Sequence, residues 1–169
     1  MSKAFTRESD DAPEMPVRPR RTSPLPPGAK NYLTPGGARR LREELERLEQ
    51  IERPSLAGSA EESDARQLQA INERIDYLRE SLQTAVVAPP PAATEAVVRF
   101  GATVTVRERD GGETRYRIVG VDETDIDRDW ISWLSPIAKA LLNARLGQRI
   151  RLILPAGGKD LEIVGIDYE

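Results

Sequence analysis

The chain of 169 residues contains no cysteine and no histidine. Without cysteine it cannot form a disulfide, a zinc site with thiolate ligands or a cysteine nucleophile, and the absence is in keeping with a reducing cytosol. Without histidine it lacks the commonest general base and the commonest metal ligand. Any chemistry is therefore left to carboxylates, lysines and hydroxyls.

Long apolar runs and a strong net charge are missing as well. No apolar run approaches the roughly 20 residues that span a bilayer, and the N-terminus lacks the apolar stretch of a signal peptide. The formal net charge of −3 argues against a protein held to nucleic acid mainly by its overall charge. We therefore expect a soluble, cytoplasmic protein with no membrane partner, built as two small units rather than around one large catalytic core.

Leucine and isoleucine repeat at heptad spacing in two stretches between residues 38 and 85, which predicts two paired helices. If the helices are antiparallel, opposed residues have numbers that add to a constant. The pairs that share one constant are Ala38–Ala85, Leu41–Leu82, Leu45–Leu78 and Leu48–Ile75. This register predicts an antiparallel coiled-coil hairpin that reverses near residues 61 and 62. Because the apolar seam closes within one chain, we expect a monomer.

The ends of the two helices carry their own signals. Thr34 is a good N-cap, and Pro35 follows it at the first helical position, where a missing N–H does no harm. Pro54 lies inside the apolar pattern of the first helix, where it should remove one backbone hydrogen bond and kink the helix. Ser59 and Glu62 have the spacing of a capping box, which predicts that the returning helix begins beside Ser59.

Proline-rich segments flank the hairpin. Residues 1–30 contain six prolines and few apolar side chains, so we expect a disordered tail and favour solvated disorder over a contact between its arginines and RNA. Pro89–Pro91 lie in an alanine-rich stretch that predicts a semi-rigid linker.

From Val97 the apolar period changes to two, which is typical of strands. Asp110–Gly112 supply a hairpin turn, and Ser135 with Pro136 form an N-cap and first-turn pair that predicts one short helix. The sequence thus predicts an α+β fold in which a helical hairpin precedes a small antiparallel sheet packed by one helix. The expected segments are the tail (residues 1–30), the hairpin (31–85), the linker (86–96) and the sheet domain (97–169).

Two features of the sheet domain have competing interpretations. The acidic stretch Asp122–Asp129 lacks the glycine and the final glutamate of a calcium loop, so we interpret it as a solvated loop, with an interaction surface as the alternative. Trp130 and Trp133 are three positions apart in a short strand, which predicts opposite faces. One of them is then an exposed contact residue, unless both belong to the core.

Glu61 and Asp64 are the candidate catalytic and metal-binding residues. They lie three positions apart where the hairpin reverses, so on one helical turn both carboxylates can face the same way and share a divalent cation. Two ligands alone make a weak site, which needs phosphates or a partner's carboxylates to complete the coordination of magnesium. The simpler interpretation is that a helix dipole stabilises acidic residues near its N-terminus, typically by about 0.3–1 kcal/mol.

Several segments between residue 31 and the end of the chain have the order and spacing of a known family. They are Leu33-Thr34-Pro35-Gly36-Gly37, Leu41–Leu45, Glu52-Arg53-Pro54, Phe100–Val104, Tyr116–Gly120, Ile131-Ser132, Ser135–Ala138 and Ala140-Leu141. In these segments the chain resembles the bacterial Gre factors, the GreA and GreB transcript-cleavage proteins that bind RNA polymerase. The resemblance implies a coiled-coil hairpin followed by an FKBP-like C-terminal domain.

The resemblance also implies a mechanism. In that family the C-terminal domain grips RNA polymerase, the hairpin enters the secondary channel, and two acidic tip residues help hold a magnesium ion. The polymerase itself then cleaves the 3′ end of backtracked nascent RNA, so the factor is not an enzyme in its own right. Here the tip role is carried to Glu61 and Asp64, with Glu62 as a substitute. The polymerase-contact role is carried to Ser135, Pro136, Ile137, Ala138 and Lys139.

The chain departs from the family pattern at the tip. The family's Asp-Leu-x-Glu-Asn segment is missing, and between Pro54 and Arg74 the chain is shorter by about two helical turns per arm, or roughly 10 Å of reach. The alternative function is therefore a regulator that occupies the channel without promoting cleavage, either a competitor of Gre factors or a Rnk-type protein. A prolyl isomerase is disfavoured, because fold does not fix function and the sequence gives no evidence of an apolar ligand pocket.

Overall fold

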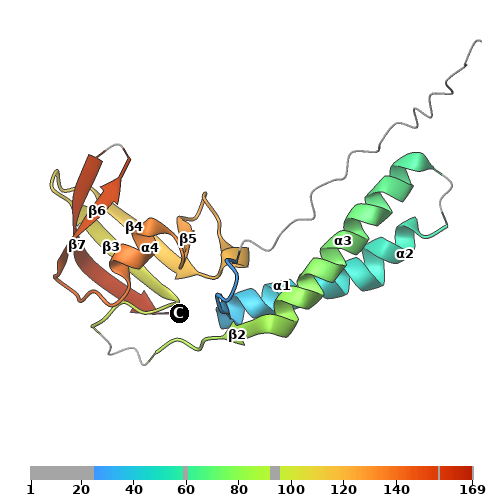
Figure 1. The fold of residues 1–169 in the computed structure, drawn as a ribbon, viewed down its shortest axis with the longest axis horizontal. Helices are drawn as coiled ribbons and strands as arrows, with labels where there is room; N and C mark the ends of the chain where they lie inside the picture. Colours follow the sequence, from blue (N-terminus) through green and yellow to red (C-terminus); the bar gives the residue numbers. More distant parts are fainter. Residues whose placement is uncertain (1–24, 59–60, 92–95, 156, 169) are drawn as a thin grey trace, which may run out of the picture.

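The computed structural model describes residues 25–58, 61–91, 96–155 and 157–168. Two helical arms extend from one side of a five-stranded sheet (Figure 1). Most of the predicted tail lies outside the described residues, and so does Ser59 of the predicted capping box. No helix within the described ranges is both long and apolar enough to cross a membrane.

The first arm is one helical path made of three pieces. It consists of α1 (Pro35–Arg47), the π-helical segment η1 (Leu48–Glu52) and α2 (Arg53–Leu56). Thr34 caps α1 as predicted, since its hydroxyl oxygen accepts a hydrogen bond from the Gly37 N–H at 3.0 Å. The predicted interruption by Pro54 takes the form of η1, because a proline ring clashes with the carbonyl four residues earlier and the chain widens before it.

The second arm is α3 (Glu62–Thr84), which runs antiparallel to the first arm. Between the arms lies a cluster made of the buried residues Leu33, Ala38, Leu41, Leu48, Ile71, Ile75 and Leu78, with Leu45 and Leu82 partly buried. Ion pairs cross the seam from Arg74 to Glu44 at 2.7 Å and from Arg79 to Glu49 at 2.6 Å. Glu61 occupies the N-cap position and makes no capping bond with its side chain, so α3 begins later than the predicted capping box requires.

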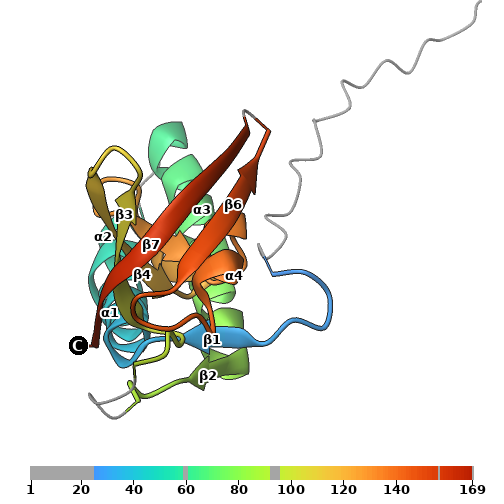
Figure 2. The same cartoon turned by 90° about the vertical axis from the view of Figure 1, so that its left-hand side faces the viewer.

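A two-stranded parallel sheet that the sequence analysis did not anticipate closes the base of the arms. It pairs β1 (Asn31–Leu33) with β2 (Ala85–Val87), as Figure 2 shows from the side of the sheet domain. The Asn31 amide donates to the Ser81 carbonyl at 2.9 Å, and Leu33 is fully buried. The helix α3 ends at Thr84, so Ala85, the last residue of the predicted register, lies in β2 instead.

The larger sheet has the strand order β5-β4-β3-β7-β6. Its strands are β3 (Ala102–Glu108), β4 (Glu113–Val119), β5 (Trp130–Ser132), β6 (Arg149–Leu154) and β7 (Gly157–Tyr168). Alternate residues of β3 are buried, as a period of two requires. The helix α4 (Pro136–Leu141) packs Ala138 and Leu141 into the same core. The α+β class was therefore predicted correctly, but β5 pairs with β4 in parallel rather than antiparallel.

Candidate functional site

Glu61 and Asp64 lie at the outer end of the arms, far from the sheet domain (Figure 1). Glu61 is exposed and Asp64 is half-buried, and the Ser63 hydroxyl donates to Glu61 at 3.5 Å. Glu62, the substitute candidate, forms an ion pair with Arg66 one turn further along α3. Across the described ranges no three acidic side chains come together to form a metal site. The tip can thus offer a divalent cation two carboxylates, and other ligands must come from elsewhere.

The predicted polymerase-contact segment forms the start of α4. Ser135 is the N-cap of this helix, and its hydroxyl accepts from the Ala138 N–H at 3.2 Å. Pro136 and Lys139 are exposed, Ile137 is half-buried, and Ala138 is fully buried in the core. Only part of this segment can therefore touch a partner, while Ser135 and Ala138 fix the shape of the turn that presents the rest.

The structure does not bring these two candidate sites together. The tip acids lie at one end of the arms, whereas α4 lies on the sheet domain near their other end (Figure 1). Their separation depends on how the arms join the sheet domain.

That junction contains a buried carboxylate that the sequence analysis misjudged. Glu123 was placed in a solvated acidic loop, but it ends the short 3-10 helix η2 (Val121–Glu123) and only 6 % of its surface is exposed. Its carboxylate accepts from the Thr34 N–H at 2.8 Å, from the Thr34 hydroxyl and from the Gly120 N–H at 3.1 Å. The Nη2 atom of Arg40 lies 3.4 Å from Oε1 of Glu123. We call Thr34, Gly37, Gly120 and Glu123 the joint.

The preceding residue, Asp122, binds the other arm. It accepts hydrogen bonds from the Ser81 hydroxyl at 2.6 Å and from the Tyr77 hydroxyl, and both donors lie on α3. Burial of the phenol, aided by this hydrogen bond, raises the pKa of Tyr77 well above its ordinary value. Tyr77 is therefore a neutral donor at physiological pH.

Aromatic side chains fill the rest of the junction. The guanidinium of Arg40 lies 5.0 Å from the centre of the Trp130 ring, a distance typical of a cation–π contact. The Tyr32 ring packs edge-on against the Trp133 ring, with 5.2 Å between the ring centres, and lies tilted by 42° against the Phe100 ring at 5.6 Å. Both tryptophans are half-buried, so the interpretation of one as an exposed contact residue was wrong.

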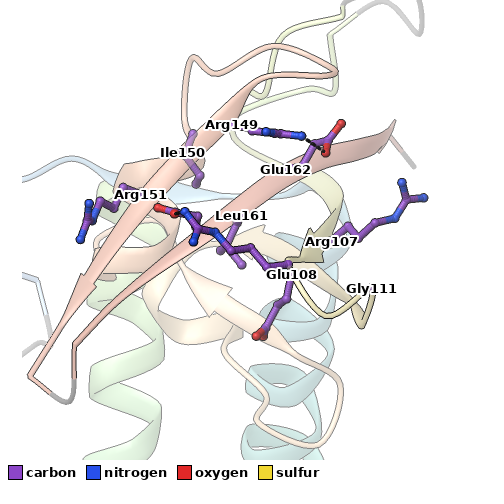
Figure 3. Close-up of a pocket in the computed structure, with 10 residues that line it drawn as sticks. Arg107, Glu108, Gly111, Arg149, Ile150, Arg151, Leu161 and Glu162 are labelled. Carbon is purple, nitrogen blue, oxygen red and sulfur yellow. Dashed lines mark hydrogen bonds and ion pairs between the residues drawn. The ribbon is translucent and has the colours of Figure 1, made fainter.

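The outer face of the sheet carries a second concentration of charge. A hollow of about 520 Å³ is lined by Arg107, Arg109, Arg149 and Arg151 together with Glu108, Asp160 and Glu162 (Figure 3). Arg149 pairs with Glu162 at 3.5 Å, and Arg109 pairs with Asp160. Because carboxylates interleave with the arginines, the hollow is better described as a salt-bridged sheet face than as a phosphate site.

Comparisons with known proteins agree with the resemblance found in the sequence. Residues 93–168 match the family model described as "Transcription elongation factor, GreA/GreB, C-term". The chain is 38 % identical over 155 residues to transcription elongation factor GreB of Neisseria meningitidis, which covers 82 % of this chain and 94 % of the relative. It is 39 % identical over 156 residues to GreA of Alkalilimnicola ehrlichii, with coverages of 83 % and 99 %.

Solved structures give a weaker match. The elongation factor GreA/GreB of Nitrosomonas europaea is 24 % identical, covering 83 % of this chain and 99 % of that chain, with a TM-score of 0.42.

Proposed function

The chain belongs to the GreA/GreB family of transcription elongation factors, and on this premise we propose that it binds RNA polymerase and promotes cleavage of backtracked RNA. In this proposal the helical arms enter the secondary channel of the polymerase while the sheet domain holds the rim. The observation that supports it best is the position of Glu61 and Asp64 at the outer end of α3. At 1.5 Å per residue the 23 residues of α3 span about 34 Å.

The tip carboxylates would act as ligands for a magnesium ion shared with the polymerase active centre. Carboxylate oxygens suit Mg²⁺, which is usually held by one or two carboxylates together with water and phosphate. The ion supplies stabilisation of the attacking or leaving oxygen during RNA cleavage. The chain contributes ligands and their position, and the polymerase performs the reaction on the 3′ end of the nascent RNA.

The sheet domain would contact the polymerase through the exposed part of the segment Ser135–Lys139. Pro136 and Lys139 face solvent at the start of α4, and the buried Ala138 and the Ser135 cap hold them in place. A cation at Lys139 suits an acidic surface on the polymerase, although it cannot form the bidentate bonds of an arginine.

The test is RNA cleavage in purified backtracked elongation complexes over a magnesium titration. The test variant is Glu61→Gln/Asp64→Asn, and the matched control is Glu73→Gln/Asp76→Asn, which neutralises a pair with the same spacing nearer the base of the same helix. We expect the intact protein and the control to shorten the RNA, and the test variant to lose at least about tenfold in rate, equivalent to ~1.4 kcal/mol of barrier. Polymerase affinity should be alike for all three. Equal cleavage by the test variant would refute the tip role.

A second candidate function is that of a regulator that occupies the channel without promoting cleavage. It is favoured by chain length, because the alignment with the Neisseria relative extends over 155 positions yet covers only 82 % of these 169 residues. The relative thus carries residues that this chain lacks. If they belong to the arms, each missing residue per arm shortens the reach by about 1.5 Å.

Lengthening the arms distinguishes the two functions. In the predicted register Leu41–Arg47 opposes Asp76–Leu82, so duplicating both heptads adds about 10 Å to each arm and preserves the seam. A copy of Tyr77 and of Ser81 stays beside the sheet domain. A cleavage factor of matched length should lose activity when lengthened, whereas a channel regulator that is too short should gain it.

A further inference from the structure

The joint couples the first arm to the sheet domain through one carboxylate. The Glu123 side chain is only 1 % exposed, and it accepts from Thr34 of the arm and from Gly120 of the sheet domain. The Thr34 hydroxyl that donates to Glu123 also caps α1 by accepting from the Gly37 N–H. A continuous chain of hydrogen bonds therefore runs from η2 into the first turn of α1.

The two parts approach each other more closely than ordinary side chains permit. A Cβ atom on Gly37 would lie 1.9 Å from Oε1 of Glu123, and a Cβ atom on Gly120 would lie 2.2 Å from the carbonyl oxygen of Tyr32. Contacts this close leave no room for one part to slide over the other. The joint is thus a fixed contact rather than a loose one.

The second arm is attached at the adjacent residue. Asp122 accepts from Ser81 and Tyr77 on α3, while Glu123 holds Thr34 at the start of α1. Two attachments to different helices oppose rotation about either one. The short helix η2 therefore sets the direction of both arms.

The length of α3 makes this direction matter at the tip. Ser81 and Glu62 are 19 residues apart on α3, or about 28 Å at 1.5 Å per residue. A catalytic or metal-binding group has to be held within about 0.5 Å of its productive position, which corresponds to a rotation of roughly 1° at this distance. A tip ligand on such an arm requires a stiff base.

We propose that Glu123 is a positioning residue, which fixes the direction of the arms and thereby places the tip carboxylates. Its effect on RNA cleavage rests on the proposed function, but its effect on arm direction does not. The variant Glu123→Ala removes the carboxylate, and Glu123→Gln keeps its shape. Asp127→Ala, at an exposed acid of the same loop, is the matched control.

Arm direction can be measured by pulsed electron spin resonance between two spin labels. Because the chain has no cysteine, the exposed positions Gln67 on α3 and Ile153 on β6 can be changed to cysteine and labelled without background. We expect Glu123→Ala to widen the distribution of label distances, and Asp127→Ala to leave it unchanged. If Glu123→Ala does not fold, Glu123→Gln gives the same comparison, with a smaller widening.

Cleavage kinetics provide the second readout. At saturating factor we expect Glu123→Ala to lower the cleavage rate by about tenfold or more while polymerase affinity stays within about threefold, a split that simple loss of folded protein does not produce. An unchanged distance distribution would overturn the proposal whatever the cleavage rate. A wider distribution of label distances together with an unchanged cleavage rate would refute the claim that Glu123 positions the tip carboxylates. A wider distribution in a protein that never cleaves RNA would support control of arm direction and reject the proposed function instead.

Discussion

Two neighbouring glycines at the start of α1 should respond oppositely to the same substitution. A Cβ atom on Gly36 would meet the Arg40 Nη1 atom at 3.5 Å, an ordinary contact, whereas on Gly37 it would lie 1.9 Å from Oε1 and 2.1 Å from Cδ of Glu123. Neither glycine has a positive φ, so alanine is allowed by the backbone at both positions. The comparison therefore isolates the contact with Glu123.

The expected magnitudes follow from two opposing effects. In a helix alanine is favoured over glycine by up to about 1 kcal/mol, so Gly36→Ala should raise the free energy of unfolding by ~0.5–1 kcal/mol. The same gain applies to Gly37→Ala, but there the Glu123 carboxylate must move away from its donors. A hydrogen bond to a charged group contributes about 1.5–3 kcal/mol, so the loss of two of them, partly offset by the gain from alanine, should leave Gly37→Ala less stable by ~2–5 kcal/mol.

Urea unfolding followed by circular dichroism at 222 nm measures both changes, because most of the helix in the described residues lies in the arms. The urea concentration at the midpoint should rise for Gly36→Ala and fall for Gly37→Ala, while the slopes of the two transitions stay similar. If Gly37→Ala were as stable as Gly36→Ala, the close approach of Glu123 to the first turn of α1 would be refuted.

Three further predictions concern the arms. The raised pKa of Tyr77 means that the folded state keeps a proton which the unfolded state loses near pH 10, so stability should fall as pH rises above about 10, and less steeply in Tyr77→Phe. Absorbance at 295 nm should show a phenol that ionises well above the ordinary pKa of tyrosine, and this phenol should be missing in Tyr77→Phe. Leu78→Ala, at a fully buried seam position, should lower the free energy of unfolding by about 2–5 kcal/mol in urea. Arg74→Ala should cost no more than about 1 kcal/mol, and less in 1 M salt, because its pair with Glu44 is partly exposed.

Periodicity and local capping made part of the fold predictable. The heptad positions Leu41, Leu48, Ile75 and Leu78 lie together in one buried cluster because side-chain spacing alone decides which face of a helix is apolar. The cap at Thr34 was equally predictable, since it involves only residues three positions apart. The parallel pairing of β1 with β2 was not, because strands of three residues carry no usable period.

The joint could not be inferred from charge patterning. Glu123 belongs to a run of acidic residues that is typical of a solvated loop. Thr34, which donates a hydrogen bond to its buried carboxylate, is 89 positions away in the sequence. One local signal was available. Gly37 lies in the first turn of α1, where glycine weakens a helix, and such a cost indicates a close approach by another part of the chain.

The joint also makes the stability of the arms and the stability of the sheet domain depend on each other. The first N–H groups of a helix have no partner within the helix, so α1 depends on outside acceptors at its base. Glu123 supplies one of them by accepting from Thr34, and it satisfies Gly120 of its own domain with the same carboxylate. Removing the carboxylate leaves the N–H groups of Thr34 and Gly120 buried without their acceptor, which destabilises both the arm and the sheet domain. The stiffness of the arms at the tip therefore depends on the contact between the arms and the sheet domain. The apolar seam between the arms does not provide it alone, and neither does the sheet.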